Sequence, residues 1–122
     1  MSNARKKLGD WGEKVAATHL ESAGFTIIGR NWRCQVGEID IIAKKNGVVS
    51  FVEVKTRRGR SAGSPEESIT HRKAQKLIQL ALTWLGAQDD DDLDWQIDLV
   101  AVELDNKGKL LRCEHFENFV TS

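Results

Sequence analysis

The sequence lacks several features that would assign it to familiar classes of protein. No apolar run approaches the ~18 residues of a membrane span, and the first seven residues contain no apolar stretch typical of a secretion signal. The two cysteines, Cys34 and Cys113, lie far apart without metal-ligand spacing, which favours reduced thiols. The three histidines are scattered and show no pairing that resembles a zinc site: His19, His71 and His115. These absences predict a cytoplasmic protein without a membrane segment.

Net charge is also absent, but the balance of zero conceals a division along the chain. Residues 1–76 carry 15 Lys/Arg against 8 Asp/Glu, a balance of +7, and residues 77–122 carry 3 against 10, a balance of −7. A polyanionic partner is therefore compatible with the first part of the chain. No recognition-helix or zinc-finger pattern predicts base-specific reading.

The length of 122 residues predicts a single domain, residues 1–122, with one core and no repeat or linker. The apolar patterning predicts the order helix, three strands, helix, two strands, which gives a mixed sheet with helices packed on it. The expected elements are a helix at 10–24, strands at 25–34, 38–45 and 48–57, a helix ending near 86, and strands at 95–104 and 109–116.

Two helix starts rest on capping signals. Asp10 followed by Glu13 resembles a capping box that opens the first helix. The second helix has two candidate starts, one at Ser64-Pro65 and one at Thr70, and the sequence does not distinguish between them.

The most informative feature is the Asn46-Gly47 pair between two strand-like runs, because this dipeptide is the strongest short-range signal for a two-residue hairpin. With these two residues as the loop, every cross-strand pair sums to 93. Asp40 then lies opposite Glu53 and Glu38 lies opposite Lys55, all on one face of the ribbon.

Two carboxylates at about 5 Å between Cβ atoms repel each other, so this arrangement favours a cation between Asp40 and Glu53. Mg²⁺ or Mn²⁺ accepts such hard oxygen ligands, and Lys55 lies beside them. A surface ladder of salt bridges explains the same residues. Because Ile42 and Phe51 share the carboxylate face, the charges border apolar packing, which favours the metal site.

Asp40 followed by Glu53-Val54-Lys55 resembles the PD-(D/E)xK motif of restriction-endonuclease-like nucleases, with Ile39-Asp40 in place of proline-aspartate. The runs 37–43 and 51–57 more closely resemble the YraN family (UPF0102), and archaeal Holliday-junction resolvases are similar in pattern. The resemblance extends from Gly9 to Val100. It implies an α/β fold with a restriction-endonuclease-like three-layer core, in which Asp40, Glu53 and Lys55 are catalytic and Asp40 and Glu53 hold metal.

The resemblance also draws in residues from the two helices. In such nucleases a glutamate of the first helix often completes the metal shell, and Glu13 matches by position. Its role as capping partner of Asp10 explains the residue equally well. Gln75 matches a polar residue of the helix after the Glu-x-Lys strand, where it is either a phosphate or water contact or an ordinary flank residue.

Basic residues follow the acidic pair directly and continue into the second helix. Between positions 55 and 76 the chain has seven Lys/Arg and two Asp/Glu, a composition that favours salt-dependent contacts with phosphates. The expected nucleic-acid contacts, with Gln75, are Arg57, Arg58, Arg60, Arg72, Lys73 and Lys76.

These observations predict a Mg²⁺- or Mn²⁺-dependent nuclease that acts on DNA in preference to RNA, with RNA left open as a substrate. It is expected to select substrates by branched or single-stranded structure rather than by sequence. A non-catalytic nucleic-acid-binding module and an interaction subunit of a DNA-processing complex are the alternatives. A homodimer would suit an enzyme that cuts two strands.

Overall fold

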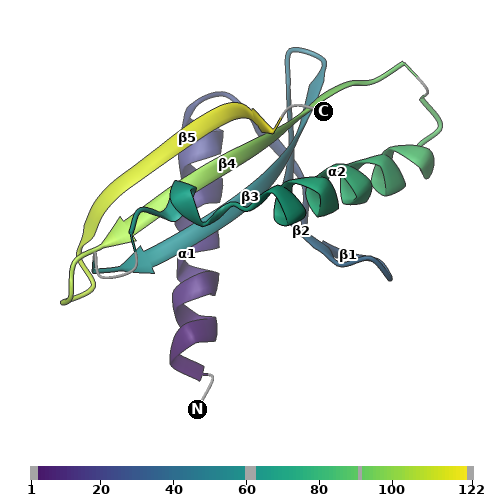
Figure 1. Ribbon diagram of the computed structural model, residues 1–122. Coiled ribbons are helices and arrows are strands. Elements are labelled where there is room, and N and C mark those ends of the chain that lie inside the picture. Colours follow the sequence, from purple (N-terminus) through teal and green to yellow (C-terminus); the bar gives the residue numbers. More distant parts are fainter. Residues whose placement is uncertain (1–2, 60–62, 91, 121–122) are drawn as a thin grey trace.

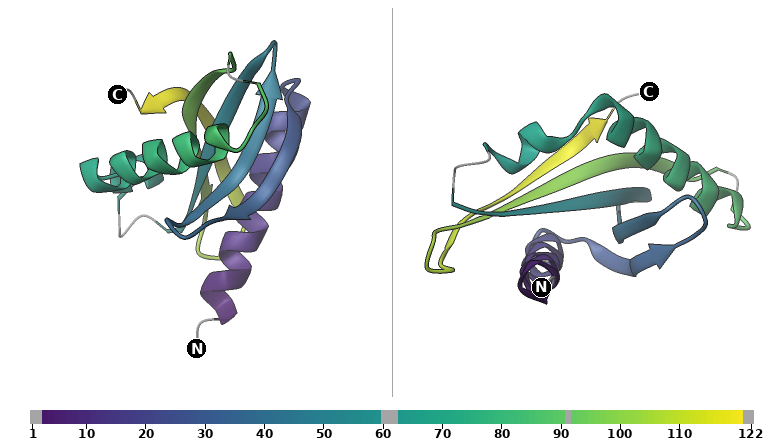
Figure 2. Two further views of the ribbon diagram at one scale, coloured as in Figure 1. Left: turned by 90° about the vertical axis from the view of Figure 1, so that its right-hand side faces the viewer. Right: turned by 60° about the horizontal axis from the view of Figure 1, so that its bottom comes forward.

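A mixed sheet of five strands lies between two helices, one on each face (Figures 1 and 2). The computed structural model describes residues 3–59, 63–90 and 92–120. The predicted order of elements and the α/β class are confirmed. The elements are α1 (Asn3–Ser22), β1 (Thr26–Arg33), β2 (Glu38–Lys45), β3 (Val48–Arg58), the short 3₁₀ helix η1 (Pro65–Ser68), α2 (His71–Gly86), β4 (Asp94–Leu104) and β5 (Leu110–Val120).

The strands lie side by side in chain order, β1 to β5, and all neighbours are antiparallel except β3 and β4. The parallel β3–β4 pair requires a crossover, which α2 provides. The β2–β3 turn has positive φ at Asn46 (52°) and Gly47 (79°), as a type I′ turn requires. Its register runs from Lys45↔Val48 to Ile41↔Val52, so the predicted sum of 93 is confirmed for these pairs.

Each helix closes its own core against one face of the sheet. Ala16, Ala17 and Leu20 of α1 pack with a group from the sheet that includes Ile41, Val52 and Val100. Leu77, Leu80 and Ala81 of α2 pack with the opposite face, which includes Ile42, Phe51 and Ile97. Trp32 is half-buried against this second core. The alternation of odd and even residues along β3 therefore decides which side chains face α1 and which face α2.

The predicted capping box is wrong, because α1 begins at Asn3 and Asp10 and Glu13 both lie within the helix. Both candidate starts of the second helix are used. Ser64 precedes η1, and Thr70 caps α2 by accepting a hydrogen bond from the Lys73 N–H at 3.1 Å. Among the described residues, no helix is long and apolar enough to cross a membrane.

Candidate functional site

The site begins where β2 separates from β3. The pairing of the two strands ends at Ile41↔Val52. The residues of β2 that precede Ile41 in the chain pair with β1 and not with β3. Beyond the ladder, the Asp40 carboxylate accepts a hydrogen bond from the Val54 N–H at 2.8 Å. A side chain thus links the two strands at the point where backbone hydrogen bonds no longer do.

Glu53 is the buried member of the acidic pair, with 5% of its surface exposed. Its carboxylate lies 3.0 Å from the Lys73 ammonium of α2 and 3.8 Å from the Lys55 ammonium. A solvated surface ladder is therefore not the arrangement found at Glu53. The position of Lys73 against Glu53 comes from the docking of α2 on the sheet, which no spacing in the sequence reports.

Asp40 and Glu53 lie close enough to affect each other's protonation. Burial, the negative charge of Glu53 and a hydrogen bond with the Glu53 carboxyl together raise the pKa of Asp40 to about 8, against the opposing effect of the Val54 N–H. The facing carboxylates inferred from the hairpin register are therefore neighbours in the fold.

Glu13 approaches this pair from α1, through a polar neighbour. Burial, followed by the charges of Glu38, Asp10 and Glu53, raises the pKa of Glu13. In the orientation of the Asn31 amide that satisfies its surroundings, the nitrogen lies 2.8 Å from Oε1 of Glu13 and 2.8 Å from Oε1 of Glu38. Asn31 therefore holds two carboxylates at the edge of the site.

The expected pairing of Glu38 with Lys55 does not appear in the cross-strand register, because β2 has already left β3 at that point. The Glu38 carboxylate instead contacts Arg33 Nε at 3.1 Å, its cross-strand neighbour on β1. Lys55 makes its ion pair with Glu53.

The three expected metal ligands do not converge tightly. Within residues 3–59, 63–90 and 92–120, a different group of acidic and imidazole side chains brings its ligand atoms within 4.8 Å of one another, namely Asp98, His115 and Glu117. At the first site the adjacent pair is Asp40 and Glu53, and Glu13 lies further out. Two carboxylates are enough for Mg²⁺, which usually keeps several waters.

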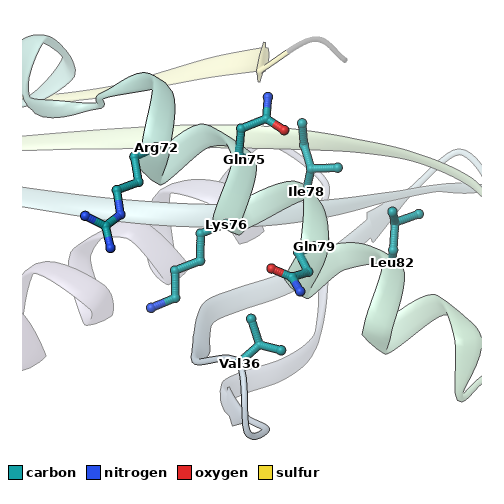
Figure 3. A pocket seen from close by; sticks show the side chains of 7 residues that line it. All are labelled: Val36, Arg72, Gln75, Lys76, Ile78, Gln79 and Leu82. Carbon is teal, nitrogen blue, oxygen red and sulfur yellow. The ribbon is translucent and has the colours of Figure 1, made fainter.

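A basic groove lies on the same side of the sheet as Glu53. It has a volume of about 640 Å³ and runs between α2 and the β1–β2 turn, where Lys76 lies against Gly37. Figure 3 shows Arg72 and Lys76 extending from α2 on the same side. The lining residues are Val36, Arg72, Gln75, Lys76, Ile78, Gln79 and Leu82.

The remaining basic residues are distributed differently. Arg57 is half-buried, and within the described part of the chain its Nε is one of the buried polar atoms without a hydrogen-bond partner. Arg58 lines a separate hollow with Lys7 and Trp11 of α1. Arg60 lies outside the described residues. The groove on α2 therefore gathers Arg72, Gln75 and Lys76, and the basic residues at the end of β3 are not among its lining residues.

Fold and site together define a mixed α/β protein with a partly buried acidic pair where two strands separate and a basic groove on the same side of the sheet as Glu53. The model of the "Uncharacterised protein family UPF0102" matches residues 12–102. The chain belongs to this family, the YraN family.

Curated relatives support this membership along nearly the whole chain. A UPF0102 protein of Roseiflexus castenholzii is 44% identical over 116 residues, which is 94% of each chain. One of Pelotomaculum thermopropionicum is 42% identical over 97% of this chain and 98% of its own. One of Acidothermus cellulolyticus is 52% identical over 69% of this chain and 64% of its own. Their names give the family and no activity.

Proposed function

We propose that this protein is a metal-dependent nuclease that hydrolyses phosphodiester bonds in DNA and selects branched or single-stranded structure. The observation that carries the proposal is the Asp40–Glu53 carboxyl pair at the separation of β2 and β3, with Lys55 next to Glu53. Glu53 is buried and Asp40 is partly buried, and the basic groove lies on the same side of the sheet as Glu53.

The donor set fits a hard divalent cation. Carboxylate oxygens suit Mg²⁺ and Mn²⁺. The raised pKa of Asp40 reflects burial first and repulsion from Glu53 second, and a bound cation would offset both. Asp40 and Glu53 would hold the ion, with Glu13 nearby. When bound, such an ion stabilises charge on the phosphoryl oxygens and makes a bound water more acidic.

The side chains around the pair perform the remaining tasks. The Lys55 ammonium, 3.8 Å from Glu53, is placed to donate to a phosphate oxygen or to orient the attacking water. Arg72 and Lys76 in the α2 groove bind the nucleic-acid backbone, and Gln75 adds an uncharged contact. Contacts with the phosphate backbone do not depend on base sequence, which agrees with selection by DNA structure.

One observation favours the alternative of a non-catalytic binding module. The Lys73 ammonium lies 3.0 Å from Glu53, so a protein cation already neutralises one of the two carboxylates that a metal ion would need. In a binding module this ion pair would be permanent, and the basic groove would act alone.

Cleavage of end-labelled DNA distinguishes the two proposals. Four-way junction, flap, single-stranded and linear duplex substrates are incubated with Mg²⁺ or Mn²⁺. Asp40→Asn and Lys55→Ala are expected to reduce the rate at least ~100-fold, because each removes a group that acts on the transition state. Asp94→Asn and Lys107→Ala change exposed residues away from the site and serve as matched controls that keep the wild-type rate.

Two results would contradict the nuclease. If no substrate is cut while wild type and variants bind DNA equally, the protein is a binding module. If it neither cuts nor shows salt-sensitive binding, both proposals fail.

A further inference from the structure

A second polar cluster lies on the opposite face of the sheet, where α1 packs. Asp98 of β4 is fully buried, and it shares its face with Val100 of the α1 core. His115 of β5 packs edge-to-face on Phe25 of that core, with 5.3 Å between ring centroids. Glu117 follows two residues later and is exposed. One ligand atom from each of Asp98, His115 and Glu117 lies within 4.8 Å of the others.

An irregularity in β5 builds this cluster. Ile97 pairs with Val120 and Leu99 pairs with Phe116, so Asp98 alone lies opposite three β5 residues, 117–119. Such bulges redirect side chains and commonly accompany functional sites. Here the Asn118 N–H donates to Asp98 Oδ1 at 2.9 Å.

The carboxylates are held in place by neighbours that leave ligand capacity. His115 Nε2 lies 2.7 Å from Asp98 Oδ2. Gln96 Nε2 donates to the same Oδ2 at 3.3 Å and to Glu117 Oε1 at 3.5 Å. Gln96 thus links Asp98 and Glu117.

An independent observation comes from Ser50, which is 1% exposed. Ser50 lines a hollow of about 260 Å³ together with Gln96 and Glu117, and its Oγ has no hydrogen-bond partner within the part of the chain that the structure describes. A buried hydroxyl without a partner is unfavourable. Water carried by an ion in this hollow would provide the missing partner.

The lysine that lines the same hollow is directed elsewhere. Lys45 Nζ donates to the Ala23 carbonyl at 2.6 Å and lies 5.2 Å from the centroid of the Phe25 ring. Its ammonium is therefore committed to the end of α1, and the acidic cluster has room for a different cation.

We propose that Asp98, His115 and Glu117 bind a divalent transition-metal ion, with water completing the coordination. An imidazole nitrogen favours Zn²⁺, Co²⁺ or Mn²⁺ over Mg²⁺ and Ca²⁺, and Zn²⁺ binds more tightly than Mn²⁺ in such N/O sites. The ion takes the place of the proton shared by His115 Nε2 and Asp98 Oδ2, and it joins the end of β5 to β4. This site is distinct from the Asp40–Glu53 pair in side chains, in strand pairing and in face of the sheet.

Titration of chelator-treated protein with Co²⁺, followed by its visible absorption, tests the proposal. The test uses an Asp40→Asn/Glu53→Gln background, so that the site of the proposed nuclease contributes nothing. One ion per chain is expected to bind, Zn²⁺ to displace it and excess Mg²⁺ to leave it in place.

His115→Gln and Glu117→Gln are expected to weaken Co²⁺ binding by more than the ~10–100-fold that loss of an outer-shell partner costs. His71→Gln changes an exposed histidine of α2 and is the matched control. Because Glu117 is exposed, its variant tests the site even where His115→Gln fails to fold. Failure of the background protein to bind Co²⁺, or undiminished binding by Glu117→Gln, would overturn the proposal without bearing on the nuclease.

Discussion

Asp40 shows how one side chain can serve both the fold and a reaction. Its carboxylate accepts the Val54 N–H where the β2–β3 ladder ends, and the same group lies beside Glu53. Burying two neighbouring carboxyls is unfavourable when both are charged, so in the metal-free protein one proton remains on the pair around neutral pH. A divalent ion offers the alternative way to neutralise it.

Stability of the metal-free protein should therefore fall as the pH rises. The pKa of Asp40 is raised from 3.8 to about 8 in the folded state, so between these values the folded chain binds more protons than the unfolded chain. The stabilisation from Asp40 is fully present below about pH 4 and is lost as pH passes through about 8. Urea unfolding with EDTA at a series of pH values measures this slope, and Asp40→Asn should remove most of it.

A calorimetric control connects this titration to metal binding. Mn²⁺ binding near pH 7 should release about one proton, because carboxylate ligands must be deprotonated. Titrations in buffers with different ionisation enthalpies measure that release. An identical pH slope in wild type and Asp40→Asn would show that Asp40 is not the titrating group.

At the scale of elements, the contact between α1 and β3 determines the position of Glu13 relative to the acidic pair. A Cβ added at Gly12 would lie 1.9 Å from Thr56 Oγ1 and 3.0 Å from Thr56 Cβ. The helix backbone therefore rests directly on β3, and Glu13 is the next residue along α1. Only glycine permits this approach, whatever its cost to helix propensity.

Gly12→Ala should destabilise the protein by about 1–3 kcal/mol, because the added methyl group forces α1 away from β3. Gly9→Ala is the matched control on the same helix, where a Cβ meets nothing within 4 Å. It should stabilise the protein by up to about 1 kcal/mol through helix propensity. Urea denaturation measures both differences.

Thr56→Ala provides the reciprocal test. In that background Gly12→Ala should cost much less, because Oγ1 and Cγ2 of Thr56 are gone while its Cβ remains. Equal stability of Gly12→Ala and Gly9→Ala in the wild-type background would show that α1 does not rest on β3 at this point.

The same elements explain what sequence alone could predict. Asn46-Gly47 determines a two-residue turn, so the β2–β3 register follows from the sequence. The structure confirms this register as far as Ile41↔Val52. The predicted start of α1 at Asp10 is wrong, since Asp10 and Glu13 match a capping pattern that also occurs inside a helix. The capping pattern identifies a helix start only when the residues before it do not themselves favour a helix.

At the scale of the whole molecule, the candidate sites depend on contacts between distant segments. Lys73 meets Glu53 because α2 packs on the face that carries the odd-numbered residues of β3. Asn31 meets Glu13 because β1 and α1 flank the same edge. Asp98 carries a charge within an apolar strand, and the folded β5 supplies its hydrogen-bonding partners, the His115 side chain and the Asn118 N–H.

The uneven distribution of charge along the chain corresponds to a particular surface of the fold. The first 76 residues, with a balance of +7, include the start of α2 and so supply the cations of the groove. Arg72 and Lys76 line it, whereas Lys73 is paired with Glu53. DNA binding should therefore depend on salt through Arg72 and Lys76 and much less through Lys73.

Fluorescence anisotropy with labelled duplex and branched DNA in EDTA, at several salt concentrations, tests this distinction without cleavage. Each phosphate contact adds about 0.9 to the slope of log K against log salt. Arg72→Ala and Lys76→Ala should each lower the slope by about that amount, and Lys107→Ala, in an exposed turn, should leave it unchanged. If Lys73→Ala lowers the slope as much as Arg72→Ala does, the Lys73–Glu53 ion pair opens on binding. If none of the α2 variants changes it, the DNA binds elsewhere and the groove has no part in the proposed function.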